Sequence, residues 1–127
     1  MASEHLERRV KRYRENLFAR YGRRNRAPKV VIGAQHFEIC KVDHSGQCPT
    51  DIAPKLEREL VKIAPLGEKG HDNYVGCCCE VRASNQIILL RPSAPIAAIA
   101  FTKALRTRTG EPVRRCRNCR EVFGNGI

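Results

Sequence analysis

The sequence predicts an α/β domain in which a few strands are flanked by helices, in the order helix, strand, strand, helix, helix, strand, helix. Three observations predict it. The chain has 127 residues, 42% of them hydrophobic, which suits one domain with one modest core. Apolar residues recur at helical spacing in several segments, and short β-branched runs lie between them. Two cysteine motifs each coincide with the predicted start of a helix, with one predicted strand between them.

The first predicted helix covers residues 4–21 and ends before Gly22. Its apolar residues recur every three or four positions on one face: Leu6, Val10, Tyr13, Leu17 and Tyr21. The opposite face carries Arg8, Arg9, Lys11, Arg12 and Arg20. This face is either simply solvated or a surface that contacts phosphates.

Two strands are predicted next, at 30–32 and 36–42, because both segments are rich in β-branched and alternating apolar residues. Residues 33–35 are predicted to be a turn or bulge between them, and 43–46 a turn after them.

The second half of the core is predicted to contain three helices and one strand. The helices are expected at 51–64, 77–90 and 116–124, and a loop rich in glycine and charge covers 66–75. The small and β-branched stretch 96–107 is expected to form one strand. The apolar segment preceding it is interrupted by arginine and proline, so no membrane span is predicted.

The positive charge of the chain lies at its two ends. There are 24 basic and 13 acidic residues, a net charge of +11. Nine basic and three acidic residues lie in 1–28, seven and two in 101–127, and eight and eight in 29–100. This distribution favours a polyanionic partner, DNA above all, over a merely solvated basic surface. The residues expected to contact the nucleic-acid backbone are Arg23, Arg24, Arg114, Arg115 and Arg117.

Seven cysteines, three of them consecutive, indicate metal binding rather than a disulfide framework. Cys116 and Cys119 are three residues apart, so both can contact one ion from the first turn of a helix. A zinc ion in a catalytic site takes three protein ligands and keeps its fourth position for water. We therefore expect Zn²⁺ on Cys78, Cys116 and Cys119.

Glu80 lies two residues beyond Cys78, where its carboxylate can face the open metal position and move protons. This offset favours Cys78 as the third ligand, but Cys77 or Cys79 can take its place. A structural zinc site made of Cys77, Cys79, Cys116 and Cys119 is the alternative, and absence of a metal is another.

These two motifs, Cys78-Cys79-Glu80 and Cys116-x-x-Cys119, resemble those of the zinc-dependent cytidine deaminase-like superfamily. The resemblance covers roughly residues 30–123 and includes the order of elements. It implies a mixed sheet of few strands flanked by helices, with Glu80 as the proton shuttle. Arg115 stands where the family pattern has proline, and the helix at 51–64 is an insertion.

Within that superfamily the chain is most similar to bacterial polymorphic-toxin deaminases, many of which carry a C-[AC]-E motif. The resemblance implies a single deaminase domain over 1–127, with a basic helix at 1–22 and a zinc-site core at 29–124. It also implies a delivered effector that acts in the cytoplasm of a target cell, is neutralised by an immunity protein, and has no targeting signal in this chain.

The expected activity is hydrolytic deamination of cytosine to uracil in single-stranded DNA. The alternatives are RNA or adenine as substrate, or a non-catalytic nucleic-acid-binding module with structural zinc. The residues expected to contact the substrate are His36 and Phe37 at the end of the first strand, Val75, and Asn118, which can instead orient the loop.

Overall fold

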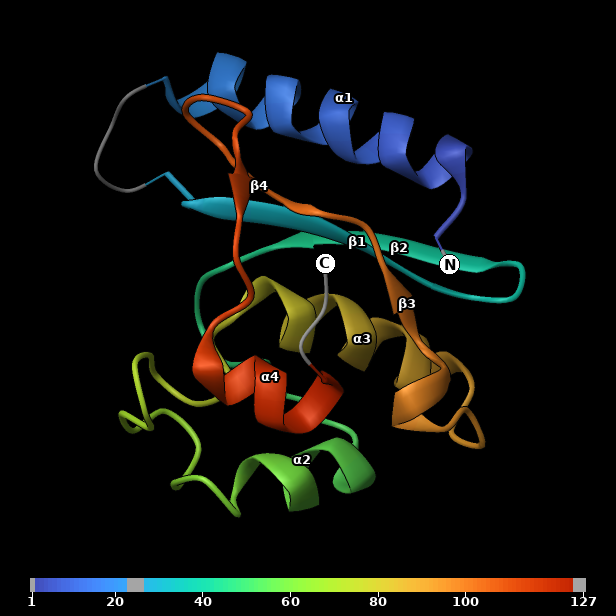
Figure 1. Ribbon diagram of the computed structural model, residues 1–127, viewed down its shortest axis with the longest axis vertical. Coiled ribbons are helices and arrows are strands. Elements are labelled where there is room, and N and C mark those ends of the chain that lie inside the picture. Colours follow the sequence, from blue (N-terminus) through green and yellow to red (C-terminus); the bar gives the residue numbers. More distant parts are fainter. Residues whose placement is uncertain (1, 23–26, 125–127) are drawn as a thin grey trace.

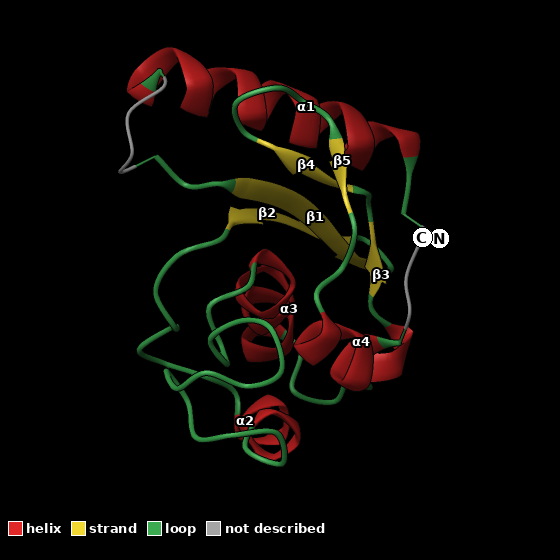
Figure 2. Ribbon diagram, turned by 60° about the vertical axis from the view of Figure 1, so that its left-hand side comes forward, coloured by secondary structure: helices red, strands yellow, loops and turns green. Residues whose placement is uncertain are grey.

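A small antiparallel sheet separates two helical layers in the computed structural model, which describes residues 2–22 and 27–124 (Figure 1). Helix α1 (Glu4–Tyr21) covers one face of the sheet, and α3 (Cys79–Leu90) packs against the other. Helices α2 (Pro54–Leu60) and α4 (Arg117–Phe123) lie on the same side as α3 (Figure 2). No helix in the described part of the chain is long and apolar enough to cross a membrane.

Strand β1 is the centre of the sheet, and the other strands are arranged around it. It pairs with β2 on one side and with β3 and β4 on the other, while β5 extends the sheet from β4. Every one of these pairings is antiparallel, so the expectation of a mixed sheet is wrong for the described strands. The strands are β1 (Val30–His36), β2 (Ile39–His44), β3 (Ala100–Phe101), β4 (Ala104–Arg106) and β5 (Pro112–Val113).

The strand predicted at 96–107 is shorter and interrupted. It begins with a 3₁₀ turn, and β3 and β4 are separated by a bulge. Ala34 pairs with Phe101 but Val31 pairs with Leu105, so three steps on β1 correspond to four on the opposite strand. The hydroxyl of Thr102 accepts a hydrogen bond from the backbone N–H of Gly33 at 2.9 Å and fills the gap. Strand β5, which was not predicted from the sequence, follows the turn at 107–110.

The β1–β2 hairpin reverses later than predicted. Residues 33–35 lie within β1, and the turn falls at Phe37 and Glu38, with Phe37 at a φ of 52°. Gly33 is required here by packing rather than by a turn. A Cβ atom at this position would lie 2.7 Å from Cγ2 of Val10 on α1. The expected turn at 43–46 also starts later, because β2 continues to His44.

The helices follow the predicted periodicity, with local corrections at their ends. Helix α1 has the predicted bounds. The helix predicted at 51–64 begins at Pro54, because the side chain of Asn85 hydrogen-bonds the backbone of Asp51 and Ala53 and holds 51–53 extended. It ends at Leu60, ahead of Pro65. The main core lies between the sheet and α3, where Ile32, Ile87 and Ile88 are buried, and it extends to α2, where Leu56 and Leu60 are buried.

Candidate metal centre and cavity

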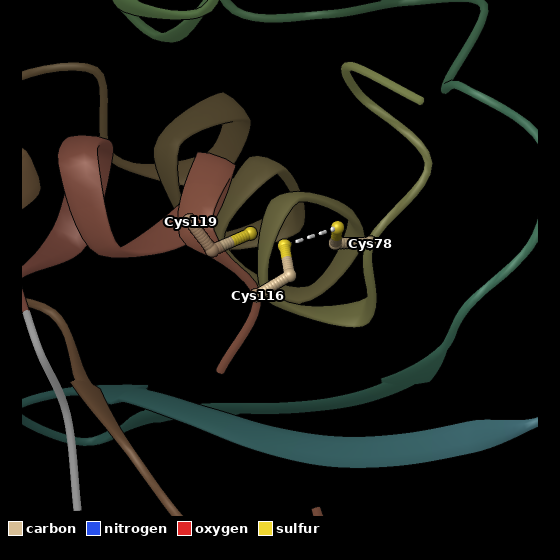
Figure 3. Close-up of side chains that lie close together, drawn as sticks. All are labelled: Cys78, Cys116 and Cys119. Carbon is tan, nitrogen blue, oxygen red and sulfur yellow. Dashed lines mark hydrogen bonds between the residues drawn. The ribbon is translucent and has the colours of Figure 1, made fainter. Parts of the chain in front are cut away.

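Three cysteine side chains converge where α3 and α4 begin. Cys78 is the N-cap of α3, Cys116 is the N-cap of α4, and Cys119 lies in the first turn of α4. Their sulfur atoms all lie within 4.8 Å of one another, and those of Cys78 and Cys116 are 3.1 Å apart (Figure 3). Tetrahedral zinc with bonds of about 2.3 Å to sulfur separates its ligands by about 3.8 Å. The cluster can therefore hold a metal such as zinc with only small side-chain movements.

The three consecutive cysteines have different surroundings. Cys79 is buried, and its thiol donates to Oε1 of Glu80 at 3.2 Å. Cys77 is half-buried, and its backbone carbonyl accepts a hydrogen bond from Gly46. Only Cys78 joins the cluster, as the offset to Glu80 predicts. Among the described residues no fourth metal-binding side chain joins it.

The three thiols titrate as one group. The pKa of Cys116 is lowered to about 3, because Cys119 and Cys78 donate hydrogen bonds to its sulfur. The pKa values of Cys78 and Cys119 are raised, mainly because each donates to Cys116. A bound metal ion would favour deprotonation of all three.

Glu80 lies beside the cysteines with only 4% of its surface exposed. Burial raises the pKa of its carboxyl group above the ordinary range, and the negative charge of Cys116 raises it further. The guanidinium of Arg115, with Nε 3.7 Å from Oε2, acts in the opposite direction. A buried carboxyl with a raised pKa is suited to accepting and returning a proton.

Arg115, which is predicted to contact the nucleic-acid backbone, is half-buried and directs its guanidinium toward Glu80. Its Nη1 donates to the carbonyls of Phe123 and Gly124, and its guanidinium lies 5.0 Å from the ring centre of Phe101. These contacts, with the Glu80 ion pair, orient it away from solvent.

Asn118 ties the two halves of the site together. Its side chain is buried, accepts from the backbone N–H of His71 at 2.9 Å, and donates to the carbonyl of Asn73 at 2.7 Å. Asn73 in turn donates to the sulfur of Cys78 at 3.4 Å. Of the two roles expected for Asn118, orienting the loop is the one that the contacts support.

A carboxylate from the same loop caps α4. Both carboxylate oxygens of Asp72 accept from the backbone N–H of Arg117 at 3.1 Å. This bond satisfies an N–H at the start of a helix whose N-cap, Cys116, makes no side-chain capping bond. The side chain of Arg117 itself is exposed and remains able to reach a phosphate.

A cavity of about 80 Å³ lies over the centre. Cys78, Cys116 and Glu80 contribute to its wall together with Asn73 and Arg114. Through Val30, Ser45 and Asn73 it adjoins a larger groove of about 690 Å³. Glu80 and two of the three clustered cysteines thus line a space that adjoins the groove.

Two predicted substrate contacts lie far from this cavity. His36 hydrogen-bonds Arg91, which follows the last residue of α3, while Cys78 precedes the first. The twelve residues of α3 span about 18 Å, so the structure does not bring His36 or Phe37 to the cysteines. The reason is the course of β1. Its first residue, Val30, lines the cavity, and its last residue, His36, lies at the opposite end of the strand.

The remaining predicted contacts are placed as follows. Val75 is fully buried in the core and does not line the cavity. Arg23 and Arg24 lie outside the described residues. Asn73, which contacts Cys78, was not predicted from the sequence to belong to the site. A single asparagine in a glycine-rich loop carries no signal, since its proximity to Cys78 depends on how Asn118 holds that loop.

No family model, curated protein or solved structure matches this chain.

Proposed function

We propose that this protein is a zinc-dependent hydrolytic deaminase that converts cytosine to uracil in single-stranded DNA. The observation that carries the proposal is the cluster of three thiols beside a small cavity, whose wall includes two of those thiols and the buried carboxyl group of Glu80. Catalytic zinc sites have three protein ligands, and nucleobase deaminases combine them with a glutamate that is not a ligand. The motif resemblance points to the same chemistry.

A zinc ion bound by the three cysteines would supply an activated water molecule for attack on C4 of the base. Glu80 would take one proton from that water and deliver it to the ring nitrogen, and would then move the second proton, from the hydroxyl group formed on C4, to the departing amine. Water is consumed, ammonia leaves, and the carbonyl of uracil replaces the amine. The raised pKa of Glu80 supports its carrying the proton between these steps.

The charge of the protein supports a nucleic acid over a free nucleoside. The net charge is +11, and Arg114 is exposed at the wall of the cavity. Arg117 is exposed one residue beyond Cys116. A polyanionic strand would neutralise several such cations at once, whereas a nucleoside would neutralise none. RNA and adenine are the alternative substrates that an assay has to compare.

The biological setting follows from the motif resemblance. On this proposal the protein is a bacterial toxin domain that acts in the cytoplasm of a target cell, and an immunity protein neutralises it. Deamination of a cell's own DNA is consistent with a toxic activity.

The test is to incubate zinc-loaded protein with single-stranded DNA, duplex DNA and RNA that contain cytosine and adenine, and to quantify uracil and inosine by mass spectrometry. We expect uracil, most of it in single-stranded DNA. Glu80→Gln should lower the rate at least about a hundredfold, the lower bound for losing a general acid–base, with zinc content and circular dichroism unchanged. Glu59→Gln, on the exposed surface of α2, is the matched control.

A structural-zinc binding module predicts a different result. Nucleic acid would be bound without any change of base, and Glu80→Gln would bind as well as the wild type. That outcome would refute the proposal.

A further inference from the structure

The groove beside the metal centre has the composition of a nucleic-acid site. It is lined by the aromatic residues Tyr21 and Tyr74, by His44, and by the cations Lys29 and Arg82. No carboxylate belongs to its lining in the described part of the chain. It shares Val30, Ser45 and Asn73 with the cavity over the cysteines, so the two are continuous along one surface.

Tyr74 combines an exposed ring with a fixed backbone. Its side chain is 55% exposed, unusual for a large aromatic residue. Its backbone N–H donates to the side chain of Asn73 at 2.8 Å, and its carbonyl accepts from Cys77 at 3.3 Å. An isolated β-bridge joins it to Lys69. The fixed backbone at this position limits the conformational entropy that is lost when the ring receives a base.

The volumes of the cavity and of the groove indicate which part of a ligand each can hold. Pockets that enclose a small molecule usually measure roughly 300–1,000 Å³, and the cavity over the cysteines, at about 80 Å³, admits only the reacting edge of a base. The groove, at about 690 Å³, is within that range. The bulk of any substrate must therefore lie in the groove.

We propose that this groove binds the nucleic-acid strand next to the target base, with the neighbouring base stacked on Tyr74. The assignment rests on the proposed function and extends it, because it names the surface and the aromatic residue that hold the strand beside the target base. Stacking on an aromatic ring tolerates any base, since every base has a π face.

Two cations of the groove can contact the phosphates of that strand. Lys29 is exposed and directly precedes β1. Arg82 is fixed by bonds from Nη1 to the carbonyl of Gln47 at 2.6 Å and from Nε to Asp43 at 3.4 Å. Asp43 offsets part of its charge, so Lys29 is expected to contribute most of the salt dependence at this end of the site.

The test measures binding separately from turnover. A short fluorescein-labelled oligothymidine, which has no exocyclic amine to remove, is titrated with zinc-loaded protein and followed by anisotropy; oligouridine is the RNA arm. Tyr74→Ala should weaken binding on the order of tenfold, within the range of about 5- to 150-fold that corresponds to losing one stacked base. Tyr74→Phe keeps the ring and should bind like the wild type.

Phe37→Ala is the matched control, because Phe37 is 77% exposed but lies at the far end of β1. Equal affinity of Tyr74→Ala and Phe37→Ala would overturn the groove assignment, even if uracil forms in a cytosine-containing strand. Conversely, Tyr74-dependent binding without any base change would overturn the proposed deaminase while supporting the groove.

Discussion

Replacing Asn118 with alanine tests the connection between the loop at 70–73 and the metal centre. The side chain is only 2% exposed and makes two hydrogen bonds, one with the backbone N–H of His71 and one with the carbonyl of Asn73. Gly70 packs directly against it, since a Cβ atom at position 70 would lie only 2.6 Å from Oδ1 of Asn118. Alanine would remove both bonds and leave a small space beneath the loop.

The magnitude follows from these contacts. Two hydrogen bonds contribute about 0.5–1.5 kcal/mol each, and a buried partner left unpaired costs about 1–3 kcal/mol. His71 is exposed, so water can replace its partner, whereas Asn73 is half-buried. We therefore expect the free energy of unfolding to fall by about 2–4 kcal/mol. The contact between Asn73 and Cys78 should loosen as well, and weaken zinc binding by roughly 10- to 100-fold.

The assay is urea unfolding of the metal-free protein, with zinc affinity measured by chelator competition. Asn16→Ala on the exposed face of α1 is the control, and it should change stability by less than about 0.5 kcal/mol. If Asn118→Ala were as stable as this control, Asn118 would not hold the loop and the reasoning would be refuted.

Three further predictions concern the metal ligands and the packing of α1. Cys78→Ser should lose bound zinc while Cys77→Ser retains it, because of these two cysteines only Cys78 belongs to the cluster. Metal analysis of the purified variants checks this. The opposite pattern would show that Cys77, and not Cys78, is the ligand. Gly33→Ala should lower the free energy of unfolding by about 1–3 kcal/mol, since the new methyl group overlaps Val10 and Leu6; unchanged urea unfolding would contradict this close packing. A strong chelator should lower the thermal unfolding midpoint and added zinc should restore it, since a ligand that binds only the native state stabilises it; an unchanged midpoint in calorimetry would argue against a bound metal.

Local patterns predicted the helices better than the strands. The bounds of α1 follow from apolar spacing within one segment, and the side chain of Ser3 caps its first turn. The break between β3 and β4 depends on pairing with β1, some seventy residues earlier, and on the Thr102–Gly33 bond. No window of neighbouring residues contains that information, so the interruption could not be predicted.

The sequence by itself indicated which residues could bind a metal. Two spacings are properties of the chain alone: Cys116 and Cys119 lie within one helical turn, and Glu80 lies two residues after Cys78. The charge at its two ends indicated a polyanionic partner in the same way.

The tertiary structure decided which residues meet. Of the three consecutive cysteines, it brought only Cys78, the N-cap of α3, to the two cysteines at the start of α4. It turned Arg115 inward against Glu80, and it placed His36 and Phe37 at the opposite end of β1. The physical reason is that these placements depend on packing between elements that are far apart in the chain. Such packing sets where the start of a helix lies and which end of a strand faces the site.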